Sequence, residues 1–291
     1  MPASSSLQVD FEREGFLGPL GILTHGQAGK VLDEVREELS SPTETQASRF
    51  KLHLFLPTIS AIAHHPTLVK AVRQALGTDD ILLWSSDINI KPKGSLGLFC
   101  PHQDSTFAGL SPPNKCLTAW VALSDPVGED EGCLVFYKES HKLGQLRHET
   151  NLDQSKNNML SMGQYISKEC LEDSCSSTIF SMECVAIPLR AGEATFHNFL
   201  TVHQSGTNRS SQDRVGLALR YMASSVRQSK PTKELVTLIS GPVPTHFSVE
   251  PRLPPSPTLE DIERGRATRV EAMRREQENY FDKSVPVQAY S

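Results

Sequence analysis

The sequence predicts a mainly β protein with a helical layer, folded as a double-stranded β-helix of the jelly-roll, cupin-like type. From residue 81 onward, short runs rich in β-branched, aromatic and small residues alternate with turn signals. Their spacing suits an antiparallel sandwich or jelly roll and not a βαβ fold. Amphipathic helical patterns precede these strands, so we expect helices to cover one face of the β core.

The first 80 residues are expected to form the helical layer. Residues 24–40 place apolar side chains at helical spacing, and Thr24 is suited to cap the start of this helix. Residues 66–76 predict a second, shorter helix, because a proline opens it and Gly77 closes it. The apolar face of the first helix consists of Val31, Leu32, Val35 and Leu39.

Residues 81–225 are expected to form the jelly-roll core. A polar insertion at 147–181 interrupts it, which we interpret either as a lid or binding loop or as a solvated surface excursion. Residues 226–291 predict a C-terminal extension, in which a proline-rich stretch leads to a charged helix from Leu259 to about Tyr280 with a solvated face. The predicted strands are ILLWSSDINIK, SLGLF, CLTAWVAL, GCLVFY, CVAIPL, EATFHNFL, TVHQSG and RVGLALRYM.

Composition and charge narrow the class of protein. The 291 residues are 38% hydrophobic and 22% charged, as in ordinary globular proteins, and we expect a single domain over 1–291. A net charge of −5 with scattered Lys and Arg predicts no nucleic-acid partner. No stretch has the apolar length of a signal peptide or a membrane span, so we expect a cytoplasmic protein without membrane contact. The oligomeric state stays open.

The six cysteines are too sparse for a disulfide scaffold, and none forms a CxxC pair. We expect reduced thiols. Cys170 and Cys175 are close enough in sequence to form a bridge in a loop, and this alternative remains open.

A histidine and an aspartate suggest a metal site. His102 and Asp104 lie two residues apart, so their side chains point to the same side of an extended backbone. A distant histidine would complete the two-histidine, one-carboxylate arrangement that leaves coordination positions open on iron. An HxD tripeptide alone is weak support, because such a pair arises by chance in many chains.

The segment that begins at His203 strengthens this interpretation. Arg214 follows His203 by eleven positions, on the next predicted strand, and a turn between them would bring its guanidinium beside the metal. The planar fork of arginine suits the distal carboxylate of a dicarboxylate, because it donates two parallel, charge-assisted hydrogen bonds. Ser205 could add a hydroxyl donor.

A series of motifs resembles the phytanoyl-CoA dioxygenase family from Phe11 to Tyr221. In order, the motifs are DFEREGFLGP, INIKPKG, PHQD, TAWVALSDPVGEDEGCLVFYKESHK, AGEATFHNFLTVHQSGTNRS and DRVGLALRY. Relatives usually have GSH where this chain reads Lys138-Glu139-Ser140-His141, and the last seventy residues match no family motif.

The resemblance implies roles for particular residues. His102, Asp104 and His203 would bind iron(II), and Arg214 and Ser205 would hold the co-substrate 2-oxoglutarate, with O₂ as oxidant. Trp120 would line the pocket floor, and Lys91 is the nearest match to a residue that the family uses for the co-substrate. Related iron halogenases carry a small residue at the position of Asp104, so the aspartate argues for hydroxylation, desaturation or ring closure.

The sequence therefore predicts an iron(II)- and 2-oxoglutarate-dependent dioxygenase that hydroxylates an aliphatic C–H of a small organic substrate, a lipid-like acid or a natural-product intermediate. The basic residues are not clustered, which disfavours a coenzyme A thioester. The alternative is a jelly-roll protein that binds a metal or ligand without redox chemistry. Arg214 discriminates between the two, because such a protein has no need for a guanidinium there.

Other candidate residues have simpler interpretations. His197 shares a strand face with His203, so it could mimic a metal ligand, but we interpret it as a packed core histidine. Trp84 is expected to be a core aromatic. The remaining candidates are expected at the surface, in turns, in loops or at helix caps: His53, His64, His65, His141, His148, Arg190 and Arg227.

Overall fold

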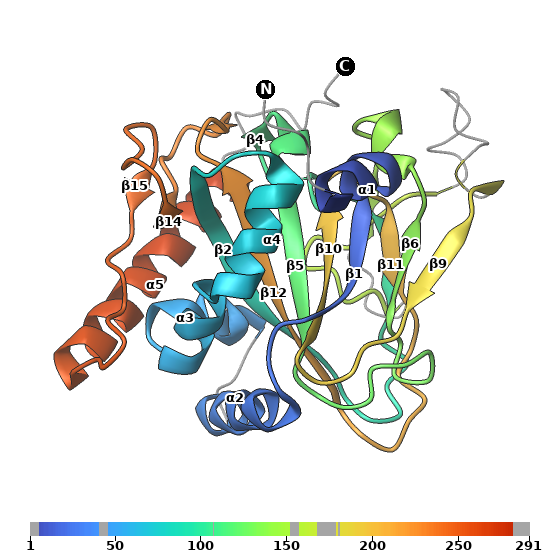
Figure 1. Cartoon of the computed structure of the whole chain (residues 1–291), viewed down its shortest axis with the longest axis horizontal. Helices are drawn as coiled ribbons and strands as arrows, with labels where there is room; N and C mark the ends of the chain where they lie inside the picture. Colours follow the sequence, from blue (N-terminus) through green and yellow to red (C-terminus); the bar gives the residue numbers. More distant parts are fainter. Residues whose placement is uncertain are drawn as a thin grey trace.

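A seven-stranded and a four-stranded sheet form the core of the computed structural model, which describes residues 6–40, 46–106, 108–151, 157–167, 179 and 181–281 (Figure 1). The large sheet has the order β1-β10-β5-β12-β2-β14-β15, and the small sheet has the order β3-β11-β6-β9. The strands are β1 (Phe16–Gly21), β2 (Ile81–Lys91), β3 (Phe99–His102), β4 (Leu110–Ser111), β5 (Cys116–Ala122), β6 (Leu134–Tyr137), β7 (Glu149–Thr150), β8 (Gln164–Tyr165), β9 (Cys184–Ile187), β10 (Glu193–Asn198), β11 (His203–Ser205), β12 (Arg214–Ala223), β13 (Arg227–Gln228), β14 (Leu235–Ser240) and β15 (Ser248–Val249).

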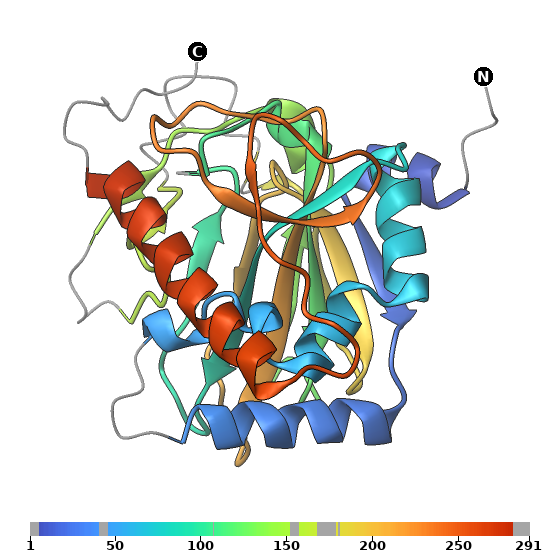
Figure 2. The same ribbon diagram turned by 90° about the vertical axis from the view of Figure 1, so that its left-hand side faces the viewer.

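Helices cover the outer face of the large sheet, which confirms the predicted mainly β architecture with a helical layer (Figures 1 and 2). The α-helices are α1 (Ser6–Glu14), α2 (His25–Glu38), α3 (Pro57–Ala63), α4 (Pro66–Leu76) and α5 (Leu259–Phe281). Short 3-10 helices are η1 (Gln46–Arg49), η2 (Leu52–Leu54), η3 (Pro113–Lys115) and η4 (Ser140–Leu143).

The central strands of the large sheet are buried on both faces. In β5, Leu117, Ala119 and Val121 pack against the helical layer. The alternating residues Trp120 and Ala122 instead pack between the two sheets. The period of two in β-strands therefore sends one set of side chains to the helices and the other set to the interior of the jelly roll, where the candidate site lies.

Local sequence signals explain the helix ends. The Thr24 hydroxyl accepts a hydrogen bond from the Gln27 backbone amide, and the Gln27 side-chain oxygen accepts one from the Thr24 backbone amide, which forms a capping box at the start of α2. Helix α4 has the predicted bounds, and Gly77 ends it at φ 67°, a left-handed conformation that glycine adopts without strain. Helices α1 and α3 were not predicted.

One predicted strand is wrong. Of the run SLGLF, only Phe99 belongs to β3, because residues 95–98 form a loop that bonds elsewhere. The Leu98 amide donates to the Asn157 carbonyl at 2.9 Å, and the Ser95 carbonyl accepts from the Asn208 amide at 3.1 Å. These partners come from the insertion and from the segment after β11, so the local sequence of residues 95–98 does not predict these hydrogen bonds.

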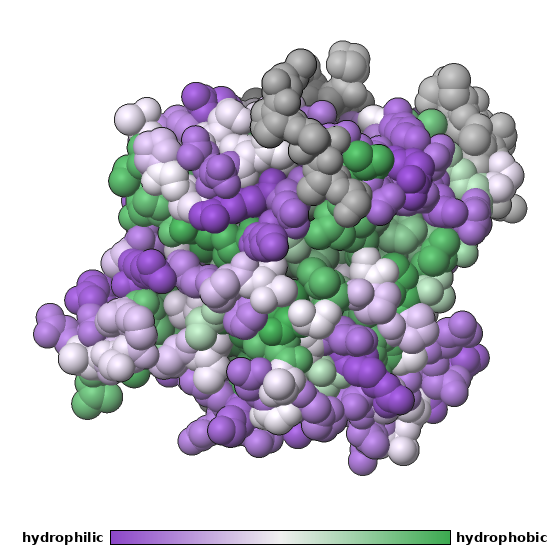
Figure 3. All heavy atoms as spheres, viewed as in Figure 1, coloured by the Kyte–Doolittle hydropathy of each residue, from purple (hydrophilic) through white to green (hydrophobic). Residues whose placement is uncertain are grey.

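The described cysteines are free, and these are Cys100, Cys116, Cys133 and Cys184. Cys170 and Cys175 lie outside the described residues. No helix in the described part of the chain is long and apolar enough to cross a membrane. Hydrophilic side chains predominate along the lower edge of the face drawn in Figure 3, over α2.

The surface or capping role predicted for His53 is wrong, since it belongs to a buried polar cluster. Its Nδ1 contacts the Ser86 hydroxyl at 2.7 Å and its Nε2 contacts the Thr237 hydroxyl at 2.9 Å. Beside it, Lys51 forms an ion pair with Glu250, and Lys51 Nζ also donates to the Leu235 carbonyl at 2.8 Å. The cluster joins η2 to the strand β14 and the segment that follows β15.

Replacement of Glu250 by alanine should destabilise the fold strongly, because it leaves the Lys51 ammonium buried without its carboxylate partner. We expect the free energy of unfolding to fall by about 3–5 kcal/mol in urea denaturation. Asp130→Ala is a matched control, because it removes an exposed ion pair with Arg209 and should change stability little. Equal effects of the two substitutions would contradict this assignment.

Candidate metal centre

Strand pairing in the small sheet brings two histidines together. His102 is the last residue of β3, His203 is the first residue of β11, and the two lie opposite each other in the antiparallel register. Asp104 follows β3 by two residues. The Nε2 atoms of His102 and His203 lie 3.7 and 3.8 Å from the same Asp104 carboxylate oxygen, Oδ1. Ligand atoms of the three residues lie within 4.8 Å of one another, which is compatible with one metal ion.

Backbone carbonyls fix the orientation of both imidazoles. Nδ1 of His102 lies 2.8 Å from the Cys100 carbonyl, and Nδ1 of His203 lies 3.0 Å from the Thr201 carbonyl. A carbonyl only accepts, so each Nδ1 carries the proton and each Nε2 offers its lone pair to the site. Burial lowers the pKa of both histidines, which keeps the rings neutral as metal ligands must be.

The second oxygen of Asp104 is held by two donors. Its Oδ2 accepts hydrogen bonds from the Thr118 hydroxyl and from His197 Nε2, the latter at 3.2 Å. Burial opposes ionisation, but the hydrogen bond from His197 and the nearby His203 and Arg220 hold the pKa of Asp104 well below its usual value. Asp104 is therefore ionised, with Oδ1 directed at the two imidazoles.

His197 thus has a role that the sequence did not reveal. It lies in β10 and is 1% exposed, as a core histidine would be, yet it contacts the carboxylate and is not in the three-residue metal cluster. The even offset from His203 indicated the correct face. The contact with Asp104 depends on residues almost a hundred positions apart, which a sequence pattern cannot supply.

Gln103, between the two ligands, anchors their loop. Its fully buried amide nitrogen donates to the Leu200 and Gly144 carbonyls at 2.7 and 2.8 Å, and its oxygen accepts from the Leu146 amide at 2.8 Å. His148, which the sequence predicts to lie in a loop, accepts a hydrogen bond through Nε2 from the Gln103 backbone amide at 3.0 Å. These contacts fix the position of the loop that carries His102 and Asp104.

Arg214 provides a buried positive charge in the same cavity. Its side chain is 1% exposed, and Nη1 donates to the Gly132 carbonyl at 3.0 Å and to the Ser205 hydroxyl at 3.1 Å. Its Nε has no hydrogen-bond partner, and none of the carboxylates in the described ranges forms an ion pair with it. Burial lowers the pKa of Arg214 to about 10, so it stays protonated at neutral pH. A buried guanidinium without an anion fits a carboxylate ligand.

Ser205 and Lys91 lie behind this guanidinium. Lys91 Nζ donates to the Ser205 hydroxyl at 2.6 Å and to the carbonyls of Ser205 and Gly206. Lys91 is fully buried, and burial together with Arg214 lowers its pKa to about 6. Neither Ser205 nor Lys91 lines the cavity, whereas Arg214 does.

Trp120 contacts the Arg214 guanidinium and lines the same cavity. The Arg214 guanidinium lies 5.0 Å from the Trp120 ring, and the indole nitrogen donates to Asn89 Oδ1 at 3.0 Å. Gly216 makes this position possible, because a Cβ there would lie 1.9 Å from the Trp120 ring. The predicted pocket residues Arg214 and Trp120 therefore share one wall.

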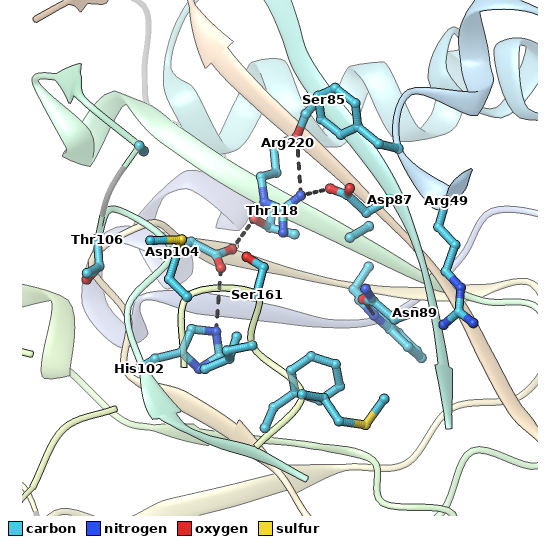
Figure 4. A pocket seen from close by; sticks show the side chains of 18 of the residues that line it. Arg49, Ser85, Asp87, Asn89, His102, Asp104, Thr106, Thr118, Ser161 and Arg220 are labelled. Carbon is cyan, nitrogen blue, oxygen red and sulfur yellow. Dashed lines mark hydrogen bonds and ion pairs between the residues drawn. The ribbon is translucent and has the colours of Figure 1, made fainter. Parts of the chain in front are cut away.

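The metal cluster, Arg214 and Trp120 line a cavity of about 410 Å³, a size typical of small-molecule sites, and Figure 4 shows part of its lining around His102 and Asp104. Arg220 lies next to Asp104 in this view and forms an ion pair with Asp87, while its Nη1 also donates to the Ser85 hydroxyl at 3.2 Å. Trp84, predicted as core, is buried and also lines the cavity. The described part of the insertion contributes Met159, Leu160, Ser161, Met162 and Gln164 to the lining, which favours the binding-loop interpretation.

Comparison with solved structures supports the fold. The chain is similar to the non-heme monooxygenase ThoJ in its apo form, with a TM-score of 0.77 and 25% identity over 94% of this chain and 97% of that one. It is also similar to the epimerase SnoN in complex with Fe3+, alpha ketoglutarate and nogalamycin RO, with a TM-score of 0.61 and 21% identity over 84% and 93% of the chains. These likenesses confirm the predicted double-stranded β-helix.

Comparison with known sequences identifies the family. Two relatives are the phytanoyl-CoA dioxygenase domain-containing protein 1 of Danio rerio and that of Mus musculus, which are 26% and 27% identical over 197 residues. Each match covers 68% of this chain and 64% of the relative, so the chain spans less than two thirds of their length. The sequence model of the phytanoyl-CoA dioxygenase family matches residues 23–216, which confirms the predicted resemblance. This chain belongs to the phytanoyl-CoA dioxygenase family.

Proposed function

We propose that this chain is an iron(II)- and 2-oxoglutarate-dependent dioxygenase that hydroxylates an aliphatic C–H bond of a small organic substrate. One observation carries the proposal: a buried guanidinium, with no anionic partner among the residues that the structure describes, faces the same cavity as the cluster of two histidines and one aspartate. A metal site with open positions and a fixed cation for a dicarboxylate are what a keto-acid co-substrate requires.

Each residue has a defined role in this proposal. His102, Asp104 and His203 bind iron, with both imidazoles held neutral and directed by the carbonyls behind them. Arg214 binds the distal carboxylate of 2-oxoglutarate, and its free Nε offers a donor for that purpose. Ser205 and Lys91 act indirectly, because they hold the Arg214 side chain in place and do not reach the cavity.

Bound iron and 2-oxoglutarate together with O₂ supply the oxidising power, and the products are a hydroxylated substrate, succinate and CO₂. The protein positions the reactants and excludes water. Phe99 and Trp120 flank the guanidinium with apolar rings, which strengthens its attraction for a carboxylate.

Hydroxylation is favoured over halogenation because Asp104 occupies the position of the carboxylate ligand, which related halogenases lack. Structural neighbours named as an epimerase and a carbocyclase mark the other outcomes to be tested.

The second candidate is a jelly-roll protein that binds a metal or ligand without redox chemistry. The metal cluster alone would suit either protein. Arg214 disfavours this candidate, because desolvating a guanidinium without an anion is unfavourable unless a ligand supplies one.

Anaerobic titration of the iron(II)-loaded protein with 2-oxoglutarate tests the proposal. We expect a weak visible metal-to-ligand charge-transfer band, because a keto acid chelates iron through its carboxylate and keto oxygens. The His203→Ala variant should lose the band with its iron ligand. Iron binding without any band would favour the non-redox candidate.

Substitution of Arg214 should weaken co-substrate binding without removing iron. In Arg214→Ala we expect the Kd for 2-oxoglutarate, measured in the same titration, to rise roughly ten- to a hundredfold. Arg190→Ala is a control, because Arg190 is exposed and pairs with Asp125 at 3.5 Å. An unchanged Kd in Arg214→Ala would remove this residue from the co-substrate site.

Loss of the His197 hydrogen bond should reduce iron affinity through Asp104. Because outer hydrogen bonds orient metal ligands, we expect His197→Leu to weaken iron(II) binding about ten- to a hundredfold, and His197→Gln to recover part of it with its amide donor. Competition with a chromogenic chelator measures the affinity, and thermal denaturation of the metal-free protein serves as the stability control. If stability falls in both variants while iron affinity stays unchanged, His197 is a packing residue only.

A further inference from the structure

Helix α5 forms a wall of the cavity although it lies beyond the region that matches the family. The family match ends at residue 216, whereas α5 spans Leu259–Phe281 and contributes Met273, Glu276 and Gln277 to the cavity lining. In Figure 2 the helix runs diagonally across the face of the molecule. The metal ligands and Arg214 lie within the matched region, so α5 adds a wall that the family motifs do not specify.

The first half of α5 is fixed to the helical layer. Gly265 lies so close to η2 that a Cβ there would lie 2.0 Å from the Leu54 carbonyl oxygen. Arg266 makes a bidentate ion pair with Glu38 of α2, at 2.6 and 2.7 Å, and its guanidinium lies 4.3 Å from the Phe55 ring. These contacts correct the expectation that the charges of this helix are only solvated.

The second half is fixed next to the cavity. Arg275 Nη1 donates to the Lys233 carbonyl at 2.9 Å and to the Ser248 hydroxyl at 3.0 Å. The Asn279 amide donates to the Thr232 carbonyl at 2.9 Å and to Glu234 Oε1 at 3.2 Å. Glu276 lies between these two anchors, so its backbone position is well defined.

Glu276 differs from the other charged residues that line the cavity. Arg220 pairs with Asp87, Asp104 belongs to the metal cluster, and Arg214 is the proposed site for the co-substrate. Arg49 has a partner. Glu276 forms no hydrogen bond or ion pair with any residue in the described ranges. Within the described lining, Glu276 is therefore a carboxylate without a counterion.

The environment of Glu276 supports the need for a cation. Burial raises its pKa to about 7, and the carboxylates of Asp87 and Glu234 act in the same direction. Lys230 and Lys51 oppose this shift, but each already faces a carboxylate, Glu234 at 3.6 Å and Glu250 in an ion pair. Neither lysine thus supplies a dedicated partner for Glu276.

We propose that Glu276 binds the protonated amine of the substrate and makes the cavity selective for an aliphatic amine. The inference rests on the proposed oxygenase function, because it assigns the substrate class of the same site. An ammonium group would complete the missing ion pair. The apolar part of the substrate would lie against the remaining lining, which includes Phe50, Trp84, Met159, Met162 and Met273.

The test compares ligands that differ only in the head group. Straight-chain amines from butyl to decyl, with alcohols and carboxylates of the same lengths, are titrated anaerobically into protein saturated with iron(II) and 2-oxoglutarate. Tryptophan fluorescence reports binding, because the chain has two tryptophans, Trp84 and Trp120, and both line the cavity. At the best chain length we expect the amine to bind at least about tenfold more tightly than the alcohol or the carboxylate.

Two variants of α5 test whether the preference for the amine depends on the Glu276 carboxylate. Glu276→Gln should weaken amine binding about tenfold and leave alcohol binding unchanged, whereas Glu278→Gln, which alters an exposed residue two positions away, should leave both unchanged. Both variants keep the metal ligands, so a loss confined to Glu276→Gln separates the carboxylate from direct coordination of the amine to iron. Wild-type amine affinity should also rise about tenfold between about pH 6 and 8, as Glu276 ionises, and this rise should vanish in Glu276→Gln.

The outcomes separate the two proposals. Absence of the charge-transfer band with 2-oxoglutarate counts against the oxygenase function itself. A normal band with equal binding of amine and alcohol, or with amine affinity unchanged in Glu276→Gln, overturns the amine assignment alone. Preferential binding of the carboxylates would also overturn it and would point to the arginine side of the cavity.

Discussion

The antiparallel pairing of β3 with β11 is the constraint on which the site depends. It sets His102 opposite His203, and the backbone of the same two segments supplies the carbonyls that fix both imidazoles. Asp104 faces both rings from the turn after β3, and its other oxygen is held by Thr118 of β5 and His197 of β10. Because the two histidines are aligned by sheet hydrogen bonds, the geometry of the metal cluster follows from the register of the small sheet. A shift of one residue would turn either histidine away from the cavity.

The large sheet supplies the complementary part of the site through its alternating faces. One face of β5 and β12 packs against the helices, while the other sends Thr118, Trp120 and Arg214 into the jelly roll. Groups in this interior are desolvated, so each charge needs a defined partner. Arg220 has Asp87, and Asp104 faces the imidazoles. Arg214 and Glu276 line the cavity without an oppositely charged partner in the described part of the chain, and they indicate which ligand groups the cavity can hold.

The parts of this arrangement that sequence could predict are those encoded locally. The spacing of His102 and Asp104 predicts that both side chains face one ion, which holds although Asp104 lies in the turn after β3 and not in the strand. The caps of α2 and α4 can be predicted from Thr24 and Gly77. The contact of His197 with Asp104 and the burial of His53 were not predictable, because each depends on partners from other strands. The same holds for Glu276, which looks like any other charge on a polar helix. Tertiary contacts, and not residue type, decide which of its charges face inward.

The division of the cavity between two parts of the chain has a functional consequence. The metal cluster and Arg214 lie inside the region that matches the family, while Met273 and Glu276 come from a helix outside it. Changes in α5 can therefore alter what the cavity accepts without moving a residue of the metal cluster. The anchors at Gly265 and Arg266 hold the helix against the layer that also packs on the large sheet, so the added wall is rigid. An anchored wall suits selection by charge, because a half-buried carboxylate on an anchored helix discriminates a cation from a neutral group more strongly than one on a mobile, solvent-exposed segment.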